Sequence, residues 1–381
     1  MPKKRGRILA GQHYMLGNHA VVEGALAAGC DFFAGYPITP ANEISERMAA
    51  RIPEAGGTYF QGEDELCSIF AVTGAALAGA KAMTATASAG FNYMLEGIGY
   101  AVAAEVPCVI VAVQRCRGEN YASQADVMQM RWGASGDHEI IVLAPSSVQE
   151  LFDFMVKAFD LAERYRTPVI VMSDTSIALM RENLSIPAEQ DIQIVERVRP
   201  TVASRDFVPF KADSDKAPPL PDLGTGYRIL HSLNPHDVHG DISWNPDIFE
   251  TMYDRVLGKI TRNRDSIVQT KGWFLDDAEI ALVAYGIESR TALDAVYEAR
   301  KSGIKVGLLR LITVWPVPET EIRAIAEQAS VVLVVEMNVG KYAGEVERVS
   351  SGRCTVVRVT KNRGEIHTST EILAAIREES P

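Results

Sequence analysis

The sequence predicts an α/β protein built from two doubly wound parallel-sheet domains. Short apolar segments alternate with longer helix-like segments from residue 17 to about 180, and the same alternation returns after Asp277. Strands that are apolar along their whole length are typical of parallel sheets with helices on both faces. With 47% hydrophobic residues in a chain of 381, there is enough apolar side chain to fill two cores.

Residues 1–190 are expected to form the first domain. Its predicted helices cover 17–29, 41–52, 64–80, 91–104 and 146–164. Its predicted strands cover 31–36, 81–87, 106–113, 139–144 and 167–174. Helices between consecutive strands are the connections that a parallel sheet requires.

Residues 191–272 are expected to be a long connection with one helix, at 246–267. The segment PFKADSDKAPPLPDLGTG at 209–226 is rich in Pro, Gly, Asp and Lys, which is typical of irregular structure. Three histidines have a spacing that a metal site or a pocket wall could use: His231, His236 and His239. No cysteine or helix fixes them, so we expect exposed loop histidines rather than metal ligands.

Residues 273–381 are expected to form the second, smaller domain. Its predicted strands are AEIALVAYG at 278–286, KVGLLRLIT at 305–313, VVLVVEMN at 331–338 and CTVVRVT at 354–360. Its predicted helices cover 288–302, 319–329, 341–350 and 368–378. The alternation again predicts a parallel sheet between helices.

Charge and hydropathy exclude several classes of partner. The net charge is -11, and basic residues are concentrated only in the first seven positions, at Lys3, Lys4, Arg5 and Arg7. We expect a solvated terminus there and no nucleic-acid partner. No apolar run reaches the roughly 18 to 20 residues of a membrane-spanning helix, and no apolar signal segment opens the chain. We therefore expect a cytoplasmic protein without a membrane partner.

The five cysteines give no metal or disulfide pattern. They are Cys30, Cys67, Cys108, Cys116 and Cys354, and no two form a C-x-x-C pair. Several lie in apolar segments, where a free cysteine behaves as a small hydrophobe. If a reaction of this protein releases electrons, another polypeptide must hold the iron–sulfur cluster that accepts them.

Three segments follow predicted strands, where open α/β sheets bind their ligands. In AGYPITPANEI at 34–44, Thr39 is expected either to be the N-cap of the next helix or to contribute to an anion site at its N-terminus. In FQGEDELCSIFAVTGAALAGAKA at 60–82, acidic residues open a helix of small residues that can pack closely. A carboxylate there either complements the helix dipole or is partly desolvated and acts as an acid–base group.

The third segment, at 106–139, contains a buried strand that ends at Gln114-Arg115 and is followed by a polar loop. Arg115 is either a surface ion-pair partner or a bidentate clamp for a substrate carboxylate. Glu119 and Asn120 lie in the same loop as Arg117, which is a second candidate cation.

Together these segments resemble the alpha chain of 2-oxoacid:ferredoxin (acceptor) oxidoreductases, most closely the type that acts on 2-oxoglutarate. The matching segments are GYPITP, GAALAGAKAMTATASAGF, VPCVIVAVQR, DVMQMRWGASGDHEIIVLAPSSVQE, YRTPVIVMSD, VGLLRLITVWPVPETEI and VLVVEMNVG. They occur in the family's order, and the resemblance covers nearly the whole chain except about 185–272.

The resemblance implies roles for individual residues. The first domain would be the pyrimidine-binding domain for thiamine diphosphate, and the second would resemble a transketolase C-terminal domain. Alignment on the GAALAGA segment gives Glu65, rather than Glu63, the role of the glutamate that bonds the aminopyrimidine ring and promotes its activation. Thr39 would contact the 2-oxoacid, and Arg115 would hold its carboxylate. Other cofactor contacts would fall on Pro37, Ile38, Ser88, Gly90 and Phe91.

The resemblance also implies partners and cofactors that this chain does not hold alone. Thiamine diphosphate would be shared with a beta subunit that carries the diphosphate-binding domain, because the chain has no Gly-Asp-Gly segment followed by an asparagine. Mg²⁺ and a [4Fe-4S] cluster would lie on partner subunits, with coenzyme A as co-substrate. Gamma-type and ferredoxin-like subunits and a ferredoxin or other acceptor would complete the enzyme.

Two departures from the family leave the substrate open. Chains of the 2-oxoglutarate type continue Gly-Gly-Pro-Ser-Thr-Gly after the arginine, where this chain has Cys116 to Ala122, and the usual Ser-Gly-Pro-Gly is Ala87 to Gly90 here. Arg117 is a candidate second cation for 2-oxoglutarate. For an aryl acid such as phenylglyoxylate, or a branched acid, apolar walls would come from Tyr121, Phe91 and Tyr93. A non-oxidative thiamine-diphosphate decarboxylase or transketolase-type subunit and a non-catalytic scaffold subunit are the alternative functions.

Overall fold

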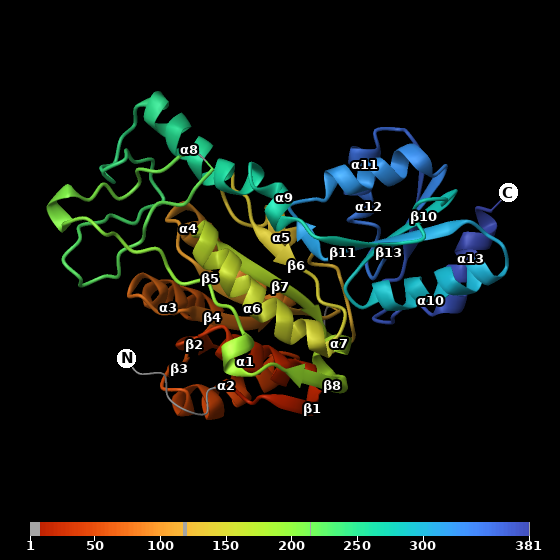
Figure 1. The fold of residues 1–381 in the computed structure, drawn as a ribbon, viewed down its shortest axis with the longest axis horizontal. Coiled ribbons are helices and arrows are strands. Elements are labelled where there is room, and N and C mark those ends of the chain that lie inside the picture. The colour runs from red at the N-terminus through yellow and green to blue at the C-terminus, as the bar shows by residue number, and fades with distance from the viewer. Residues whose placement is uncertain (1–7, 117–119, 214, 381) are drawn as a thin grey trace.

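The computed structural model describes residues 8–116, 120–213 and 215–380. Arg117, Glu119 and the basic N-terminal residues lie outside these ranges. Within them, no helix combines the length and the apolar character needed to cross a membrane. The chain forms an N-terminal body, which includes most of the connecting segment, and a C-terminal body beside it (Figure 1).

A seven-stranded sheet forms the centre of the N-terminal body, in the order β12-β6-β7-β5-β4-β2-β3. Its strands are β2 (Phe32–Gly35), β3 (Thr58–Gln61), β4 (Ala82–Ala87), β5 (Cys108–Gln114), β6 (Ile141–Leu143), β7 (Pro168–Asp174) and β12 (Thr313–Trp315). All neighbours are parallel except β12, which runs antiparallel to β6. The predicted strands of the first part are present, with ends that differ by a few residues.

Helices cover both faces of this sheet. The helices α1 (Gly17–Ala27), α2 (Asn42–Glu54) and α6 (Val148–Tyr165) pack on one face, and α3 (Glu65–Leu77) and α4 (Ser88–Ala103) pack on the other. Alternate residues of β5 enter the two cores: Val109 and Val111 face α1 and α6, whereas Ile110 and Ala112 face α3 and α4. A strand buried on both faces is therefore apolar throughout, as the sequence indicated.

Some elements of this body were not predicted. The strands β1 (Gly11–Leu16) and β8 (Arg181–Ile186) pair as an antiparallel ribbon outside the main sheet. Two short helices, α5 (Gln129–Trp132) and α7 (Thr175–Leu179), follow β5 and β7. The exposed, polar residues of the ribbon lack the apolar pattern that identified the other strands.

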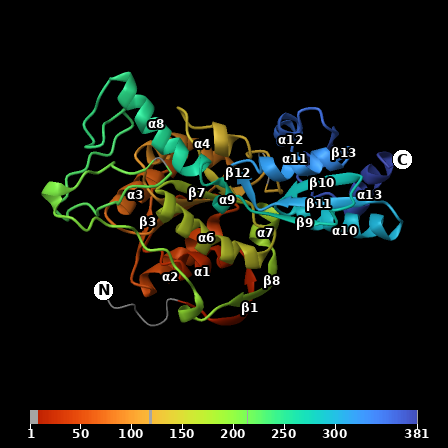
Figure 2. The same cartoon turned by 45° about the horizontal axis from the view of Figure 1, so that its top comes forward.

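The connecting segment is mostly irregular and extends beside α3 and α4, away from the C-terminal body in both views (Figures 1 and 2). It contains two 3₁₀ turns, η1 (Glu189–Asp191) and η2 (Ser204–Asp206), and ends in helices. The single helix predicted at 246–267 is wrong, because the structure has α8 (Pro246–Thr261) and a separate α9 (Arg264–Ile267). The backbone of Asn263, with φ -107° and ψ 18°, leaves the helical conformation between them.

A five-stranded sheet forms the C-terminal body, in the order β14-β13-β10-β11-β9. Its strands are β9 (Thr270–Trp273), β10 (Ile280–Tyr285), β11 (Val306–Leu311), β13 (Val331–Glu336) and β14 (Thr355–Thr360). Its helices are α10 (Glu288–Lys301), α11 (Glu319–Gln328), α12 (Ala343–Ser350) and α13 (Ser369–Glu378). The neighbours are parallel except β9, which is antiparallel to β11.

The segment that follows β11 crosses from the second sheet to the first, although the sequence assigned it to the second domain alone. The predicted strand 305–313 ends at Leu311, and β12 then pairs Thr313 with Leu143 and Trp315 with Val142 of the first sheet. The predicted class of two doubly wound, parallel-dominated sheets is confirmed. Both sheets carry an antiparallel edge strand that was not predicted, which is common in folds of this class.

Candidate functional site

The candidate site lies where the seven-stranded sheet changes its winding direction. The chain passes from β2 outward to β3 and then returns to place β4 on the other side of β2. The helix α2 after β2 packs on one face, and α4 after β4 packs on the opposite face. The two connections therefore diverge at the carboxyl ends of neighbouring strands. This arrangement is a topological switch point, where open α/β sheets bind ligands.

Thr39 lies on the β2 side of this switch point. Its Oγ1 accepts a hydrogen bond from Asn42 Nδ2 at 3.1 Å, and Asn18 Nδ2 donates to the neighbouring Pro40 carbonyl at 2.7 Å. The helix α2 begins at Asn42 with Ala41 as its N-cap, so the alternative in which Thr39 caps the helix is wrong. Thr39 is partly buried, Ile38 is half-buried and Pro37 is exposed.

Glu65 is the first residue of α3 and is buried, whereas Glu63 is exposed. Asp64 caps the helix by accepting a hydrogen bond from the Cys67 backbone N–H at 2.7 Å. Burial raises the pKa of the Glu65 carboxyl; its own backbone N–H opposes this shift and Asp64 adds to it. Among the described residues, no lysine or arginine forms an ion pair with Glu65. A desolvated carboxyl of this kind is suited to hydrogen-bond a ligand.

Gly90 brings α4 against this carboxyl. A Cβ atom added at Gly90 would overlap the Glu65 carboxylate and the Thr86 hydroxyl, so only glycine fits without a shift of these groups. The sequence did not identify Thr86, near the end of β4, as a site residue, although its hydroxyl and the Glu65 carboxylate both lie against Gly90. The one signal in the sequence was its position near the end of a predicted strand.

Ser88 and Arg115 connect the ends of β4 and β5. The Arg115 backbone N–H donates to Ser88 Oγ at 3.1 Å, and Ser88 Oγ donates to the Arg115 carbonyl at 3.2 Å. The Arg115 side chain is half-buried, and its Nη1 donates to Asn120 Oδ1 at 3.0 Å. Arg115 is therefore held by polar groups of its own loop and has no carboxylate partner among the described residues.

Asp126 is a neighbour of this site that the sequence analysis missed. Its side chain is hydrogen-bonded to Ser88, while its Oδ2 is buried and has no partner among the described residues. Burial raises the pKa of Asp126, and the Ser88 bond and the Lys341 charge oppose that shift. The only sequence signal was an acidic residue in a segment that follows a buried strand.

Gln124 fixes the segment after Arg115 against the C-terminal body. Its Nε2 donates to the Tyr285 carbonyl at 2.8 Å, and its Oε1 accepts from the Met337 backbone N–H at 3.0 Å. Tyr285 and Met337 lie at the carboxyl ends of β10 and β13. The candidate site is thus positioned by both sheets, although its predicted residues all come from the first.

The predicted aromatic wall is divided between the core and the surface. Phe91, in α4, is buried in the apolar core between α4 and the sheet. Tyr121 and Tyr93 are 57% and 64% exposed. The backbone of Tyr121 is held by the Thr175 hydroxyl, which donates to its carbonyl at 3.4 Å. Arg117, the predicted second cation, lies outside the described residues.

The histidines of the connecting segment do not match the expectation of exposed loops. His236 is 3% exposed, and His231 is half-buried with its Nδ1 3.3 Å from the Ala104 carbonyl; only His239 is exposed. Packing of the loop under α8 buries His236, which the local sequence gave no means to foresee. In the ranges that the structure describes, no cluster of three or more His, Cys, Asp or Glu has a metal-binding arrangement.

Two family models match the chain. The thiamine-diphosphate-binding domain of pyruvate flavodoxin/ferredoxin oxidoreductase matches residues 23–224, and core domain II of pyruvate:ferredoxin oxidoreductase matches residues 278–372. Most of the connection that contains α8 lies between the two matched regions.

The chain is similar to subunits of several 2-oxoacid oxidoreductases. It is 48% identical over 372 residues to the 2-oxoglutarate synthase subunit KorA of Methanothermobacter marburgensis, which covers 96% of this chain and 98% of that one. The ketoisovalerate oxidoreductase subunit VorB of Methanothermobacter thermautotrophicus is 37% identical and covers 95% and 96%. The 2-oxoglutarate:ferredoxin oxidoreductase of Magnetococcus marinus, solved with 2-oxoglutarate, coenzyme A and succinyl-CoA bound, superposes with a TM-score of 0.89 at 27% identity. That match covers 97% of this chain but 65% of the longer one.

Proposed function

Because the chain belongs to the pyruvate and 2-oxoacid:ferredoxin oxidoreductase family, we propose that it is the alpha-type subunit of such an enzyme. The enzyme would decarboxylate a 2-oxoacid oxidatively to an acyl-CoA and CO2 and pass the electrons to ferredoxin or another acceptor. The family membership favours this function over the non-oxidative decarboxylase, transketolase-type and scaffold alternatives.

The observation that supports this proposal most strongly is the setting of Glu65. Its carboxyl is buried at a topological switch point, lies against Gly90 and has no cationic partner in the described part of the chain. A carboxyl without an internal cation remains available to hydrogen-bond a ring nitrogen of a ligand. The residues present therefore fit the aminopyrimidine of thiamine diphosphate, which the matched family domain binds.

Thiamine diphosphate, when bound, supplies a carbon nucleophile and accepts the electron pair that remains when CO2 leaves. Within this chain, Glu65 would hold a proton shared with the aminopyrimidine. Arg115 would orient the 2-oxoacid by a paired hydrogen bond to its carboxylate, replacing its present bond to Asn120. The Thr39 hydroxyl would donate a hydrogen bond to the substrate, while its oxygen accepts a hydrogen bond from Asn42. Pro37, Ile38 and Ser88 would border the cofactor.

The domain roles follow the predicted division. Residues 1–190 would be the pyrimidine-binding domain, 191–272 the connection and 273–381 the domain that resembles a transketolase C-terminal domain. A beta subunit would hold the diphosphate with its Mg²⁺ and a [4Fe-4S] cluster, and gamma and ferredoxin-like subunits would complete a cytoplasmic complex. Two observations support the presence of partner subunits. The similar proteins are named as subunits, and the Magnetococcus chain is longer than this one.

We favour 2-oxoglutarate as the substrate. The 48% identity to a 2-oxoglutarate synthase subunit exceeds the 37% identity to a ketoisovalerate oxidoreductase subunit. Arg117 would pair with the second carboxylate of 2-oxoglutarate. Tyr121, which is exposed in the loop after Arg115, would also contact the substrate.

The test uses the complex purified anaerobically with its native partner chains. Reduction of a viologen dye is followed with coenzyme A and 2-oxoglutarate, pyruvate, 2-oxoisovalerate, indolepyruvate or phenylglyoxylate. Preference for 2-oxoglutarate supports the proposal in full, and preference for a branched or aryl acid corrects only the substrate. If no acid supports reduction by a complex that contains thiamine diphosphate, the proposed oxidoreductase function is wrong.

A further inference from the structure

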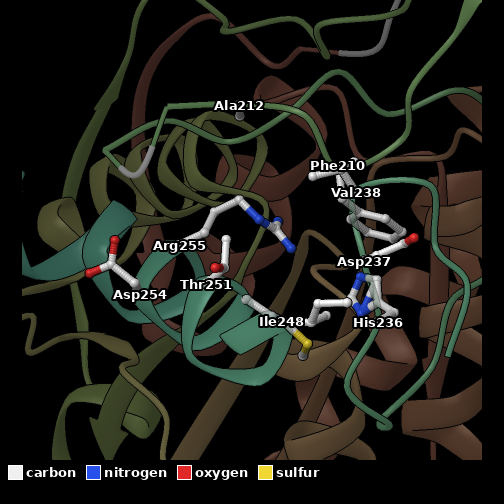
Figure 3. A pocket seen from close by; sticks show the side chains of 10 residues that line it. Phe210, Ala212, His236, Asp237, Val238, Ile248, Thr251, Asp254 and Arg255 are labelled. Atoms are coloured by element: carbon white, nitrogen blue, oxygen red, sulfur yellow. The ribbon is translucent and has the colours of Figure 1, made fainter. Parts of the chain in front are cut away.

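A cavity of about 320 Å³ lies between α8 and the loops of the connecting segment, away from the candidate catalytic site. Its walls combine apolar and polar side chains, with two acids at the rim: Phe210, Ala212, Val238, Ile248, Met252, His236, Thr251 and Arg255, with Asp237 and Asp254. In Figure 3, the Arg255 guanidinium, the Phe210 ring and the His236 ring converge on this space. Its size and its mainly apolar lining match those of small-molecule sites.

Arg255 is part of a buried cluster in which positive charge exceeds negative charge. Glu105, which is fully buried, pairs with Arg255 and lies 3.0 Å from Lys259 Nζ. Arg166 donates to the Glu105 carbonyl at 3.1 Å, and its buried Nη2 has no hydrogen-bond partner in the part of the chain that the structure describes. Three buried cations thus share one carboxylate. An additional anion would offset the cost of burying the excess positive charge.

His236 is a second, independent feature that points to a ligand. The residue is 3% exposed, and neither ring nitrogen has a hydrogen-bond partner among the described residues. Burial, and then the charge of Arg255, lowers the pKa of His236 and so favours the neutral ring. A neutral imidazole has one N–H donor and one acceptor nitrogen. A buried donor and acceptor without partners cost free energy unless a bound group satisfies them.

The acidic residues at the cavity rim do not fill this need. Asp254 forms an ion pair with Arg262 on the outer side of α8. Asp237 Oδ1 accepts from the backbone N–H groups of His239, at 2.8 Å, and Asp241, at 3.1 Å. Both carboxylates are therefore engaged in local contacts, whereas the Arg255 guanidinium points into the cavity (Figure 3).

We propose that this cavity binds a small organic anion, with its carboxylate or phosphate on Arg255 and His236 and its apolar body against Phe210, Ile248 and Met252. The Phe210 ring lies 4.0 Å from the His236 ring and 5.2 Å from the Arg255 guanidinium, so the three groups are preorganised around one position. The backbone N–H of Phe210 donates to the Val238 carbonyl at 3.0 Å, which holds the chain at Phe210 against the loop that contains His236. The site would be separate from the thiamine-diphosphate site and does not depend on it.

The test measures binding to the purified full chain by titration calorimetry and ligand-observed NMR, with benzoate, phenyl phosphate and benzyl alcohol as probes. We expect at least one anion to bind about tenfold or more tightly than the neutral alcohol. The stronger of the two anions identifies the head group. Equal affinity for the alcohol, or no binding of either anion, would overturn the proposal.

Three variants locate the binding. Ile248→Trp fills the cavity, His236→Phe removes the ring donor and Arg255→Met removes the charge; each should weaken anion binding about tenfold or more. Because Arg255→Met also disturbs the Glu105 pair, the other two variants keep the test valid if that chain does not fold. Arg205→Gln, at a site that is 87% exposed, is the matched control and should bind as the wild type does. Unchanged affinity in both His236→Phe and Ile248→Trp would contradict the assignment.

Discussion

Glu65 at the start of α3 and Glu105 just after the end of α4 are both buried, but their surroundings differ in kind. Glu65 at the start of α3 has no cationic partner among the described residues, and burial raises its pKa. Burial would also raise the pKa of Glu105, but the charges of Lys259, Arg255 and Arg166 outweigh it and lower that pKa. The comparison separates a carboxyl left available for a ligand from one used to attach α8 to the sheet.

This difference also explains why the two regions respond differently to change. Around Glu65 the close neighbours Gly90 and Thr86 are neutral and Asp64 is acidic, so no cation among the described residues compensates the carboxylate charge. The fold therefore does not need that charge. Around Glu105 the charges come from segments far apart in the chain. Removal of that carboxylate would leave buried cations without a partner.

The first prediction tests the functional side of the comparison. Glu65→Gln should leave the fold intact and reduce turnover of the complete enzyme by about two to four orders of magnitude, because acid–base assistance to the cofactor is lost. Viologen reduction and circular dichroism measure the two effects. Glu63→Gln, at the neighbouring exposed acid, is the control and should retain activity. Near-normal turnover of Glu65→Gln would remove Glu65 from the proposed role.

The second prediction tests the structural side. Glu105→Gln should lower the free energy of unfolding by about 3 to 5 kcal/mol, because breaking a buried ion pair leaves uncompensated charge. Urea unfolding of the purified chain measures the loss. Glu279→Gln breaks an exposed pair with Lys305 and should change stability little. Equal effects of the two substitutions would show that the buried cluster does not stabilise the fold.

The third prediction concerns substrate binding by Arg115. Arg115→Ala should weaken binding of the 2-oxoacid by about 2 to 5 kcal/mol, since it removes one partner of a desolvated charge pair. The expected signature is a raised KM without a change in melting temperature. Arg115→Lys, which keeps the charge but loses the paired geometry, should fall between wild type and alanine. An unchanged KM would exclude Arg115 from the pocket.

Two glycines in helices test whether close packing around the Glu65 carboxyl matters for stability. Gly90→Ala should destabilise the chain by about 1 to 3 kcal/mol, because the new Cβ overlaps the Glu65 carboxylate. Gly74→Ala in α3 has open space around the new atom and should stabilise the chain by up to about 1 kcal/mol. Thermal unfolding of both variants tests this expectation. The same sign for both would show that the close packing at Gly90 is unimportant.

The smallest expected effect is an opposite pH dependence. The lowered pKa of Glu105 gives stability that is fully present above the usual glutamate pKa and declines as the pH falls below it toward the lower folded pKa. The raised pKa of Glu65 gives the reverse, with stability present at low pH and lost as the pH rises through its folded value. Unfolding free energies of Glu105→Gln and Glu65→Gln, each compared with wild type between about pH 3 and 7, should diverge in opposite directions. Parallel curves would contradict the distinction.

The alternation of strands and helices follows from the sequence alone, and the family resemblance predicts the roles of Glu65 and Arg115. Fully apolar strands such as β5 and helices such as α6 depend on local periodicity, which is visible in the sequence. The polar ribbon of β1 and β8 has no such pattern and was missed.

Contacts between residues that are far apart in the chain are visible only in the folded structure. The Glu105 cluster joins residues about 150 positions apart, β12 leaves the second body to pair with β6, and His236 is buried by a loop that looked exposed. The physical reason is that propensity and periodicity act over a few residues, whereas pairing and burial depend on which surfaces the folded chain brings together. For the same reason, the cavity beside α8 had no counterpart in the sequence.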